Sequence, residues 1–157
     1  MNDEEDRITI LVVEENALTR EGLREILEIQ PDMRVVGEGE DSASTVVLTA
    51  EKRPDVVLLG IEIPDDEVVA TVSQIRDCSP RSRTIVLSMY EGPCLIDALL
   101  TAGIRGYLLK SIHWQELVAA MRAVCADNDR IILGVSGPSS RPTVVVNQLN
   151  GSRRPFS

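Results

Sequence analysis

Short apolar runs alternate with longer amphipathic segments along residues 7–126. The runs are rich in β-branched side chains and contain few polar ones, which is typical of strands that are buried on both faces. The first of them, ITILVV, is followed directly by polar residues. The pattern predicts five strands, at residues 8–13, 34–37, 56–59, 84–88 and 107–109.

The segments between the runs have the period of helices. In the first, Leu23, Ile26 and Leu27 share one side, and charged residues occupy the rest of the circumference. Pro54 stops the second helix and Gly103 ends the fourth. The sequence therefore predicts helices at residues 17–29, 42–53, 67–78, 93–102 and 114–126.

Five strand–helix units with apolar strands predict an α/β fold, in which a doubly wound five-stranded parallel sheet has helices on both faces. Right-handed crossovers and the short repeat favour the flavodoxin-like strand order 2-1-3-4-5. In such sheets the functional side chains lie at the carboxyl ends of the strands. Those ends carry Glu14 and Glu15 after the first strand, Gly60 after the third, Ser88 at the end of the fourth and Lys110 after the fifth.

Around these residues the sequence resembles the CheY-like receiver domains of two-component response regulators. The resemblance is strongest to the NarL/FixJ branch, in which a LuxR-type helix-turn-helix follows the receiver. It covers about residues 7–126. Four stretches carry it in order: ILVVEENALTREGL at 10–23, RPDVVLLGIEIP at 53–64, IVLSMY at 85–90 and AGIRGYLLK at 102–110.

The resemblance implies a role for most of these residues. Glu14 and Glu15 match the acidic pair that holds Mg²⁺ in the family. Ser88 matches the switch hydroxyl that bonds the phosphoryl group, and Tyr107 matches the switch aromatic. Lys110 is similar to the lysine that pairs with the phosphoryl oxygens.

Gly60 departs from the family pattern, because the family carries the phosphorylated aspartate at this position. Glycine has no nucleophile, so an acyl phosphate cannot form there. We expect the side chain of Glu62 to point elsewhere, and Asp65 and Asp66 lie further along the loop. A displaced carboxylate among these three remains an alternative phosphoacceptor.

The charge of this pocket also differs from that of a complete receiver. Three carboxylates and one lysine sum to −2, which attracts a divalent cation, whereas Glu14, Glu15 and Lys110 sum to −1. A glutamate is one methylene longer than aspartate and can reach across the space that Gly60 leaves open. We therefore predict a contact between Lys110 and a glutamate, with Mg²⁺ binding weak or absent, and no cofactor.

Composition narrows the possible partners of the chain. Its 157 residues carry a net charge of −9, with −12 on residues 1–130 and +3 on residues 131–157. The acidic body repels phosphate backbones, so it is a poor nucleic-acid binder by itself. No apolar run is long enough for a membrane span, residues 1–6 are unlike a secretory signal, and three scattered cysteines indicate reduced thiols in the cytoplasm.

The aromatic and apolar residues between the fourth strand and the last helix suggest a contact face. Leu95 and Leu99 belong to a broad apolar helix surface, and Tyr107 and Trp114 follow it. Core filling explains the same residues equally well. If they form a face, they favour a homodimer, because receiver domains commonly associate through this region.

We divide the chain into an acidic, disordered segment at 1–6, a receiver domain at 7–126 and a linker at 127–157 that leads to a DNA-binding domain outside this chain. Thr143–Val146 is a candidate edge strand. The predicted function is non-enzymatic: an atypical, phosphorylation-independent transcriptional regulator, controlled by homodimerisation or by a small-molecule effector. Similar orphan receivers recur among actinomycete regulators of secondary metabolism, which implies antibiotic biosynthesis as a target.

Two other functions remain open alongside the displaced phosphoacceptor. One is a stand-alone receiver that acts by protein contacts alone. The other is a flavin-binding flavodoxin relative, although the Glu14–Glu15 pair would repel the phosphate of a flavin nucleotide.

Overall fold

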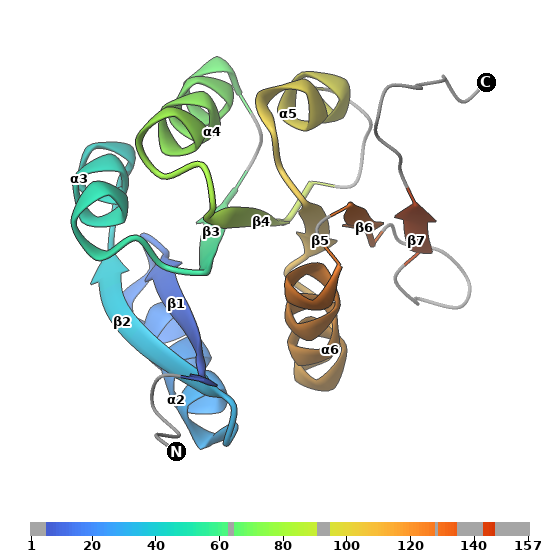
Figure 1. Cartoon of the computed structure of the whole chain (residues 1–157). Helices are drawn as coiled ribbons and strands as arrows, with labels where there is room; N and C mark the ends of the chain where they lie inside the picture. The colour runs from blue at the N-terminus through green and yellow to red at the C-terminus, as the bar shows by residue number, and fades with distance from the viewer. Residues whose placement is uncertain (1–5, 63–64, 91–94, 128, 135–142, 147–157) are drawn as a thin grey trace.

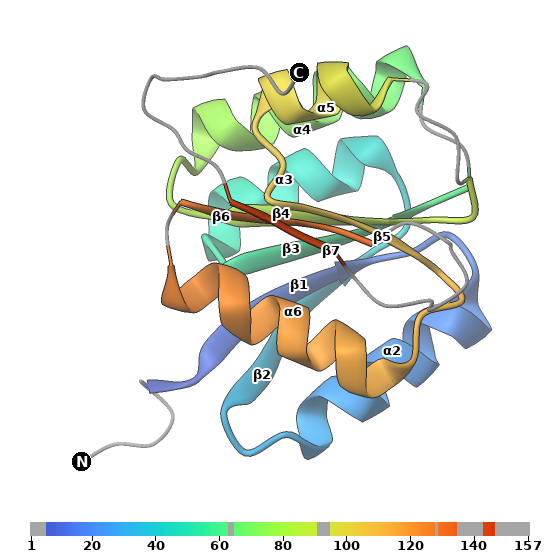
Figure 2. The same cartoon turned by 90° about the vertical axis from the view of Figure 1, so that its right-hand side faces the viewer.

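A parallel sheet with helices on two faces forms the body of the molecule (Figures 1 and 2). The structure is a computed structural model, and it describes residues 6–62, 65–90, 95–127, 129–134 and 143–146. Its strands are β1 (Ile8–Val13), β2 (Met33–Gly39), β3 (Val56–Ile61), β4 (Arg83–Ser88), β5 (Gly106–Leu109), β6 (Arg130–Leu133) and β7 (Thr143–Val146). Its helices are α2 (Ala17–Ile29), α3 (Ser42–Lys52), α4 (Asp66–Cys78), α5 (Ile96–Ala102) and α6 (Trp114–Ala126).

The strand order confirms the predicted flavodoxin-like topology. The order along the sheet is β2-β1-β3-β4-β5-β6-β7, so the first five strands follow the predicted order 2-1-3-4-5. Helices α3, α4 and α5 cover one face, and α2 and α6 cover the other (Figure 1). The predicted bounds of α2 and α6 are confirmed, and the other predicted ends differ by at most three residues.

The sheet is wider than predicted, which corrects the proposed linker. β6 pairs in parallel with β5, and β7 pairs antiparallel with β6, so the described sheet has seven strands rather than five. The candidate strand at Thr143–Val146 is thereby confirmed, whereas Arg130–Leu133 is not a linker. A run of four residues in a glycine- and proline-rich stretch gave little periodic signal, and only the open edge of β5 makes it a strand.

Two apolar clusters fill the spaces between the sheet and its helices. Successive residues of a strand face opposite sides, so Ile10 and Val12 pack toward α2 and α6, and Leu11 and Val13 pack toward α3, α4 and α5. These strand residues are buried, as the continuous apolar runs predict. The polar residues at the strand ends therefore lie just beyond this apolar core.

Side-chain caps fix where three of the helices begin. Asn16 accepts a hydrogen bond from the backbone N–H of Thr19, at 2.9 Å, and so caps α2. Asp41 forms a capping box with Ser44 at the start of α3. Asp65 accepts from the N–H of Val68 at the start of α4. Each cap satisfies a backbone donor that the helix leaves unpaired, and the caps of α2 and α4 lie beside the carboxyl edge of the sheet.

The strand β6 gives a test of the domain boundary. Ile132 is only 3% exposed and belongs to the core beneath α6. We expect Ile132→Ala to lower the free energy of unfolding by about 2–5 kcal/mol, because the substitution leaves a cavity in a packed core. Ile131→Ala, at a half-buried neighbouring position, serves as the control and should cost clearly less. Equal and small losses in urea unfolding for both variants would show that β6 is not part of the core.

Candidate functional site

The four polar or special positions that the sequence places at strand ends come together at the carboxyl edge of the sheet. Glu14 follows β1, Gly60 lies in β3, Ser88 ends β4 and Lys110 follows β5. The parallel register sets their depths, because Val13 lies opposite Leu59, and Ser88 lies opposite both Ile61 and Leu109. The switch from β1 to β3 is where open α/β sheets place their ligands.

Glu14 is a buried carboxylate. Its side chain is 2% exposed, and its Oε2 accepts a hydrogen bond from the backbone N–H of Asn16 at 2.9 Å. Oε1 lies 3.1 Å from Nζ of Lys110, which is an ion-pair contact, and among the described residues this oxygen has no hydrogen-bond partner. The guanidinium of Arg20 donates to the backbone carbonyl of Glu14, at 2.6 Å. Lys110 therefore supplies the charge that compensates Glu14 inside the protein.

Gly60 provides the space that Glu14 occupies. A Cβ atom built on Gly60 would collide with Oε1 of Glu14 and would also press on the carbonyl oxygen of Val13. Any side chain at position 60 thus competes with the observed placement of Glu14. The glycine and the long acidic side chain fit each other, as the extra methylene of glutamate predicts.

Lys110 completes the pair from the opposite side. Its side chain is 15% exposed, and its backbone N–H donates to the carbonyl of Ser88, at 2.9 Å, which fixes where the side chain starts. The predicted contact between Lys110 and a glutamate is therefore present. The expectation that Glu62 points elsewhere is wrong, because its Oε2 lies 3.8 Å from the same ammonium. Glu62 is 70% exposed, so its attraction to Lys110 is weakened by water.

Ser88 and Tyr107 are engaged within the chain. The hydroxyl of Ser88 is buried, donates to the carbonyl of Glu62 at 3.2 Å and accepts from the N–H of Tyr90 at 2.9 Å. The hydroxyl of Tyr107, a residue that is 1% exposed, donates to the carbonyl of Tyr90 at 2.8 Å. The two hydroxyls thus hold the segment after β4 against the ends of β3 and β5.

The other acidic residues do not join this cluster. Glu15 is exposed, and the carboxylate of Asp65 caps the first turn of α4 by accepting a hydrogen bond from the N–H of Val68. Within the described ranges, no group of three or more His, Cys, Asp and Glu side chains could hold a metal ion. Because Lys110 occupies the inner oxygen of Glu14, the residues present do not fit the Mg²⁺ site that the resemblance implies.

The contact face inferred from the sequence is only partly at the surface, which corrects that interpretation. Leu99 and Tyr107 are buried in the cluster beneath α5, because the helix turns Leu99 toward the sheet and Tyr107 points into the interior. Leu95 is half-buried with a φ of 66° before α5, and Trp114 is 46% exposed. Met89, which sequence reasoning missed, is also exposed.

The described cysteines do not belong to this site. Cys78 and Cys125 are free, and burial raises the pKa of the Cys125 thiol. Cys94 lies outside the described residues. In the part of the chain that the structure describes, every helix is too short or too polar to cross a membrane.

Comparison with known proteins places this chain and its fold in a family. The family model "Response regulator receiver domain" matches residues 10–122. The chain is 32% identical to the transcriptional regulatory protein DegU of Brevibacillus brevis over 126 residues, which are 79% of this chain and 53% of DegU. It is also 32% identical to the oxygen regulatory protein NreC of Staphylococcus epidermidis over 117 residues, covering 73% of this chain and 53% of NreC. The chain thus spans about half the length of these relatives.

Solved structures of receiver domains and response regulators have the same fold as this chain. The receiver domain of the response regulator NarL from Mycobacterium tuberculosis superimposes with a TM-score of 0.71 at 26% identity, over 78% of this chain and 98% of that one. A LuxR-family response regulator from an Aurantimonas species gives a TM-score of 0.70 at 29% identity, over 76% and 86% of the two chains. From the fold, the carboxyl-edge site and these likenesses, the chain belongs to the response regulator receiver domains, in their NarL/DegU (LuxR-type) branch.

Proposed function

We propose that this chain is an atypical receiver domain that works without aspartyl phosphorylation. One observation carries the proposal: the carboxylate of Glu14, bound by Lys110, occupies the space that a side chain at position 60 would need. By the family resemblance, position 60 is that of the phosphorylated aspartate, and Lys110 is the lysine that would meet the phosphoryl group. In this chain the two partners of that reaction are a glycine and an already paired lysine.

The state of the switch residues supports the same proposal. In the family pattern Ser88 is the hydroxyl that turns to the phosphoryl group, with Tyr107 as its coupled aromatic. Here both hydroxyls already have partners in the chain, through Glu62 and Tyr90. A phosphoryl group would have to break these bonds before it could gain a new one.

A displaced phosphoacceptor is the second candidate, and one contact favours it. Glu62 is exposed and its carboxylate lies 3.8 Å from Lys110, so it is a carboxylate near the family lysine. Against it, the described acids do not gather into a cation site, and Asp65 is bound as a helix cap. We therefore rank phosphorylation at Glu62, Asp65 or Asp66 below the unphosphorylated mode.

For the whole protein we propose a regulatory role rather than an enzymatic one. The relatives are transcriptional regulators about twice as long as the matched region, which supports a cytoplasmic regulator whose DNA contacts come from a helix-turn-helix outside this chain. Control of antibiotic biosynthesis remains a prediction. A stand-alone receiver is the alternative, and the length of the encoded protein beyond residue 157 distinguishes the two.

Homodimerisation or a small-molecule effector would then supply the signal. The half-exposed Trp114 at the start of α6 and the half-buried Leu95 are what remains of the inferred contact face, and they support a homodimer. An effector near position 60 would have to displace the Lys110–Glu14 pair or bind over it.

The central prediction concerns phosphorylation and Mg²⁺. We expect the melting temperature of the chain to stay the same when Mg²⁺ and beryllofluoride, a phosphoryl mimic, are added, because the pocket offers neither an acceptor nor a free lysine. Intact mass after incubation with acetyl phosphate and Mg²⁺ should show no phosphoryl group. The double variant Glu14→Asp, Gly60→Asp restores the family acids. Its melting temperature should rise with Mg²⁺ and beryllofluoride, and its mass should increase by one phosphoryl group after incubation with acetyl phosphate and Mg²⁺. Clear stabilisation of the unsubstituted chain, or a phosphoryl group mapped to Glu62, Asp65 or Asp66, would contradict the proposal.

The steric dependence of Glu14 on Gly60 can be measured as a coupling energy. Gly60→Ala should lower the free energy of unfolding by about 1–3 kcal/mol, because the new methyl group collides with Oε1 of Glu14. In a Glu14→Ala background, the same change should lower the free energy of unfolding by at least about 1 kcal/mol less than it does in the unsubstituted chain. Glu15→Ala, which removes the exposed neighbouring acid, is the matched control and should give no such relief. The coupling energy is measured by urea unfolding of the single and double variants. A coupling energy of zero would show that the carboxylate of Glu14 does not lie against position 60.

A further inference from the structure

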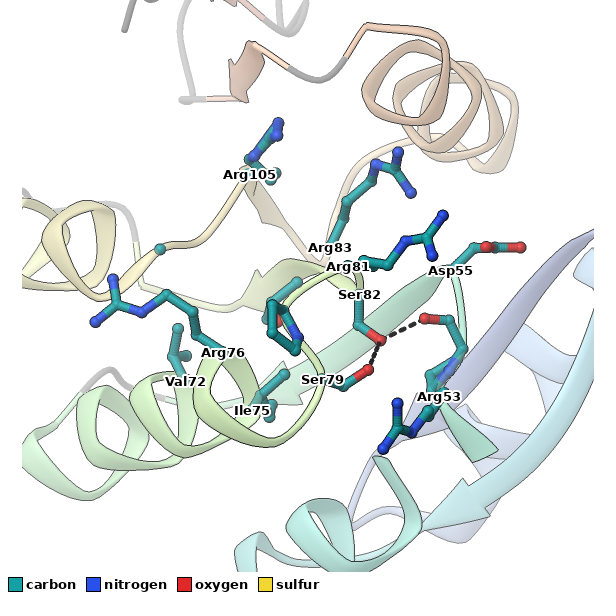
Figure 3. Close-up of a pocket in the computed structure, with 14 residues that line it drawn as sticks. Arg53, Asp55, Val72, Ile75, Arg76, Ser79, Arg81, Ser82, Arg83 and Arg105 are labelled. Carbon is teal, nitrogen blue, oxygen red and sulfur yellow. Dashed lines mark hydrogen bonds between the residues drawn. The ribbon is translucent and has the colours of Figure 1, made fainter. Parts of the chain in front are cut away.

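A cleft of about 810 Å³ lies at the end of the sheet opposite Glu14 and Lys110. It is formed where the chain enters β3, β4 and β5, together with the carboxyl ends of α3 and α4 (Figure 3). Five arginines line it: Arg53, Arg76, Arg81, Arg83 and Arg105. We call it the arginine cleft. Its size is that of pockets that take small molecules.

The charge of the arginine cleft opposes that of the chain. Asp55 is the one acidic residue of its lining, so the lining has a formal charge of +4, in a protein whose net charge is −9. The carboxylate of Asp55 already accepts hydrogen bonds from the N–H and the hydroxyl of Thr9, at 2.9 and 3.1 Å. It is therefore only partly available to the arginines.

Three of these arginines have no acidic partner among the residues that the structure describes, although the chain has more acids than bases. Within the described ranges, Arg53, Arg76 and Arg81 form no salt bridge. Elsewhere, Arg24 pairs with Glu28 and Glu38, and Arg122 pairs with Asp32. Arg7 and Arg34 also form no salt bridge within the described ranges, so what distinguishes the cleft is that several such arginines line one cavity.

Arg105 is the most constrained member. It is half-buried, and its guanidinium donates a 3.4 Å hydrogen bond to the carbonyl of Arg130. Burial, and next the charge of Arg83, lower the pKa of Arg105, and Asp129 and Asp127 oppose this shift. A cation that is desolvated beside another cation is stabilised by any anion that enters the space between them.

Helix ends account for only part of the positive charge. Arg76 lies in the last turn of α4 and Arg53 caps α3, where a cation complements the helix dipole. Arg81 and Arg83 belong to the segment that enters β4, and Arg105 precedes β5. These three positions have no helix terminus to neutralise, so the helix dipole does not explain why arginines line the cleft there.

The floor of the cleft is fixed in place. Ser82 donates a hydrogen bond to the carbonyl of Pro54, and its hydroxyl lies 2.7 Å from that of Ser79 (Figure 3). These bonds tie the segment that carries Arg81 and Arg83 to the start of β3. Figure 3 also shows that the guanidinium groups are spread around the cleft rather than meeting at one point.

We propose that the arginine cleft binds a small anionic molecule that carries two or more phosphate groups. Guanidinium groups pair with phosphate oxygens in a bidentate manner, and several spread cations match a chain of phosphates better than a single one. The acidic charge of the surrounding body disfavours a DNA or RNA duplex, whereas a small polyanion fits inside the cleft. The proposal does not depend on Gly60, because the cleft lies at the other end of the sheet.

Calorimetric titration with inorganic tripolyphosphate, at low salt and without Mg²⁺, tests the proposal on the 157-residue chain. We expect saturable binding that weakens as salt is added. Arg81→Gln and Arg105→Gln should each weaken it about tenfold or more, because each removes a charge-assisted contact. Arg81 is exposed, so its variant keeps the test valid if loss of the half-buried Arg105 impairs folding.

Matched controls separate a built site from general attraction. Arg24→Gln removes the same charge from α2, on the other face of the sheet, and should change the affinity by less than about twofold. Gly60→Ala should leave tripolyphosphate binding unchanged, which distinguishes this cleft from the proposed function. The absence of binding, equal weakening by Arg24→Gln, equally tight binding of inorganic phosphate, or tighter arginine-dependent binding of a DNA duplex would each overturn the proposal.

Discussion

The buried pair of Glu14 and Lys110 is the interaction on which the carboxyl edge of this receiver depends. A carboxylate that is 2% exposed is costly unless a cation and hydrogen bonds compensate it, and here Lys110 and the N–H of Asn16 do so. Removal of one partner of such a pair costs about 3–5 kcal/mol, because the other charge stays buried. The pair also needs Gly60, since a side chain there would take the place of Oε1. Three strands are thus joined at one point.

The two ends of the sheet differ in how their charged side chains are paired. At the carboxyl end the buried Glu14 is paired with Lys110, and the hydroxyls of Ser88 and Tyr107 form hydrogen bonds within the chain. At the amino end, five arginines line one cleft of a protein that is otherwise acidic, and three of them, Arg53, Arg76 and Arg81, form no salt bridge with the residues that the structure describes. An anion gains the most binding energy from guanidinium groups that have no carboxylate partner. The arginine cleft is therefore a better place for an anionic ligand than the carboxyl edge, where Lys110 is already paired with Glu14.

The likeness to NarL, DegU and NreC is a likeness of sequence and fold. The strand order and the positions of Ser88, Tyr107 and Lys110 fit a receiver, because the sheet brings strand ends together whatever side chains they carry. In this chain the carboxylate of Glu14 lies 3.1 Å from the ammonium of Lys110 and occupies space that a side chain at position 60 would need.

The sequence by itself determined the alternation of strands and helices, the order of the first five strands and the gathering of Glu14, Gly60, Ser88 and Lys110. Local periodicity and the geometry of parallel sheets are sufficient for these features. Even the contact of Lys110 with a glutamate follows from the length of that side chain and the space at Gly60.

Only the tertiary structure decided the rest. The short run Arg130–Leu133 becomes a strand because β5 offers an open edge, and Leu99 and Tyr107 are core residues because α5 and β5 face the interior. The arginine cleft brings together α3, α4 and the entries to β4 and β5, so its residues are far apart in the chain and share no local motif. Charges that converge through folding leave no periodic signal, and for that physical reason a sequence pattern does not reveal them.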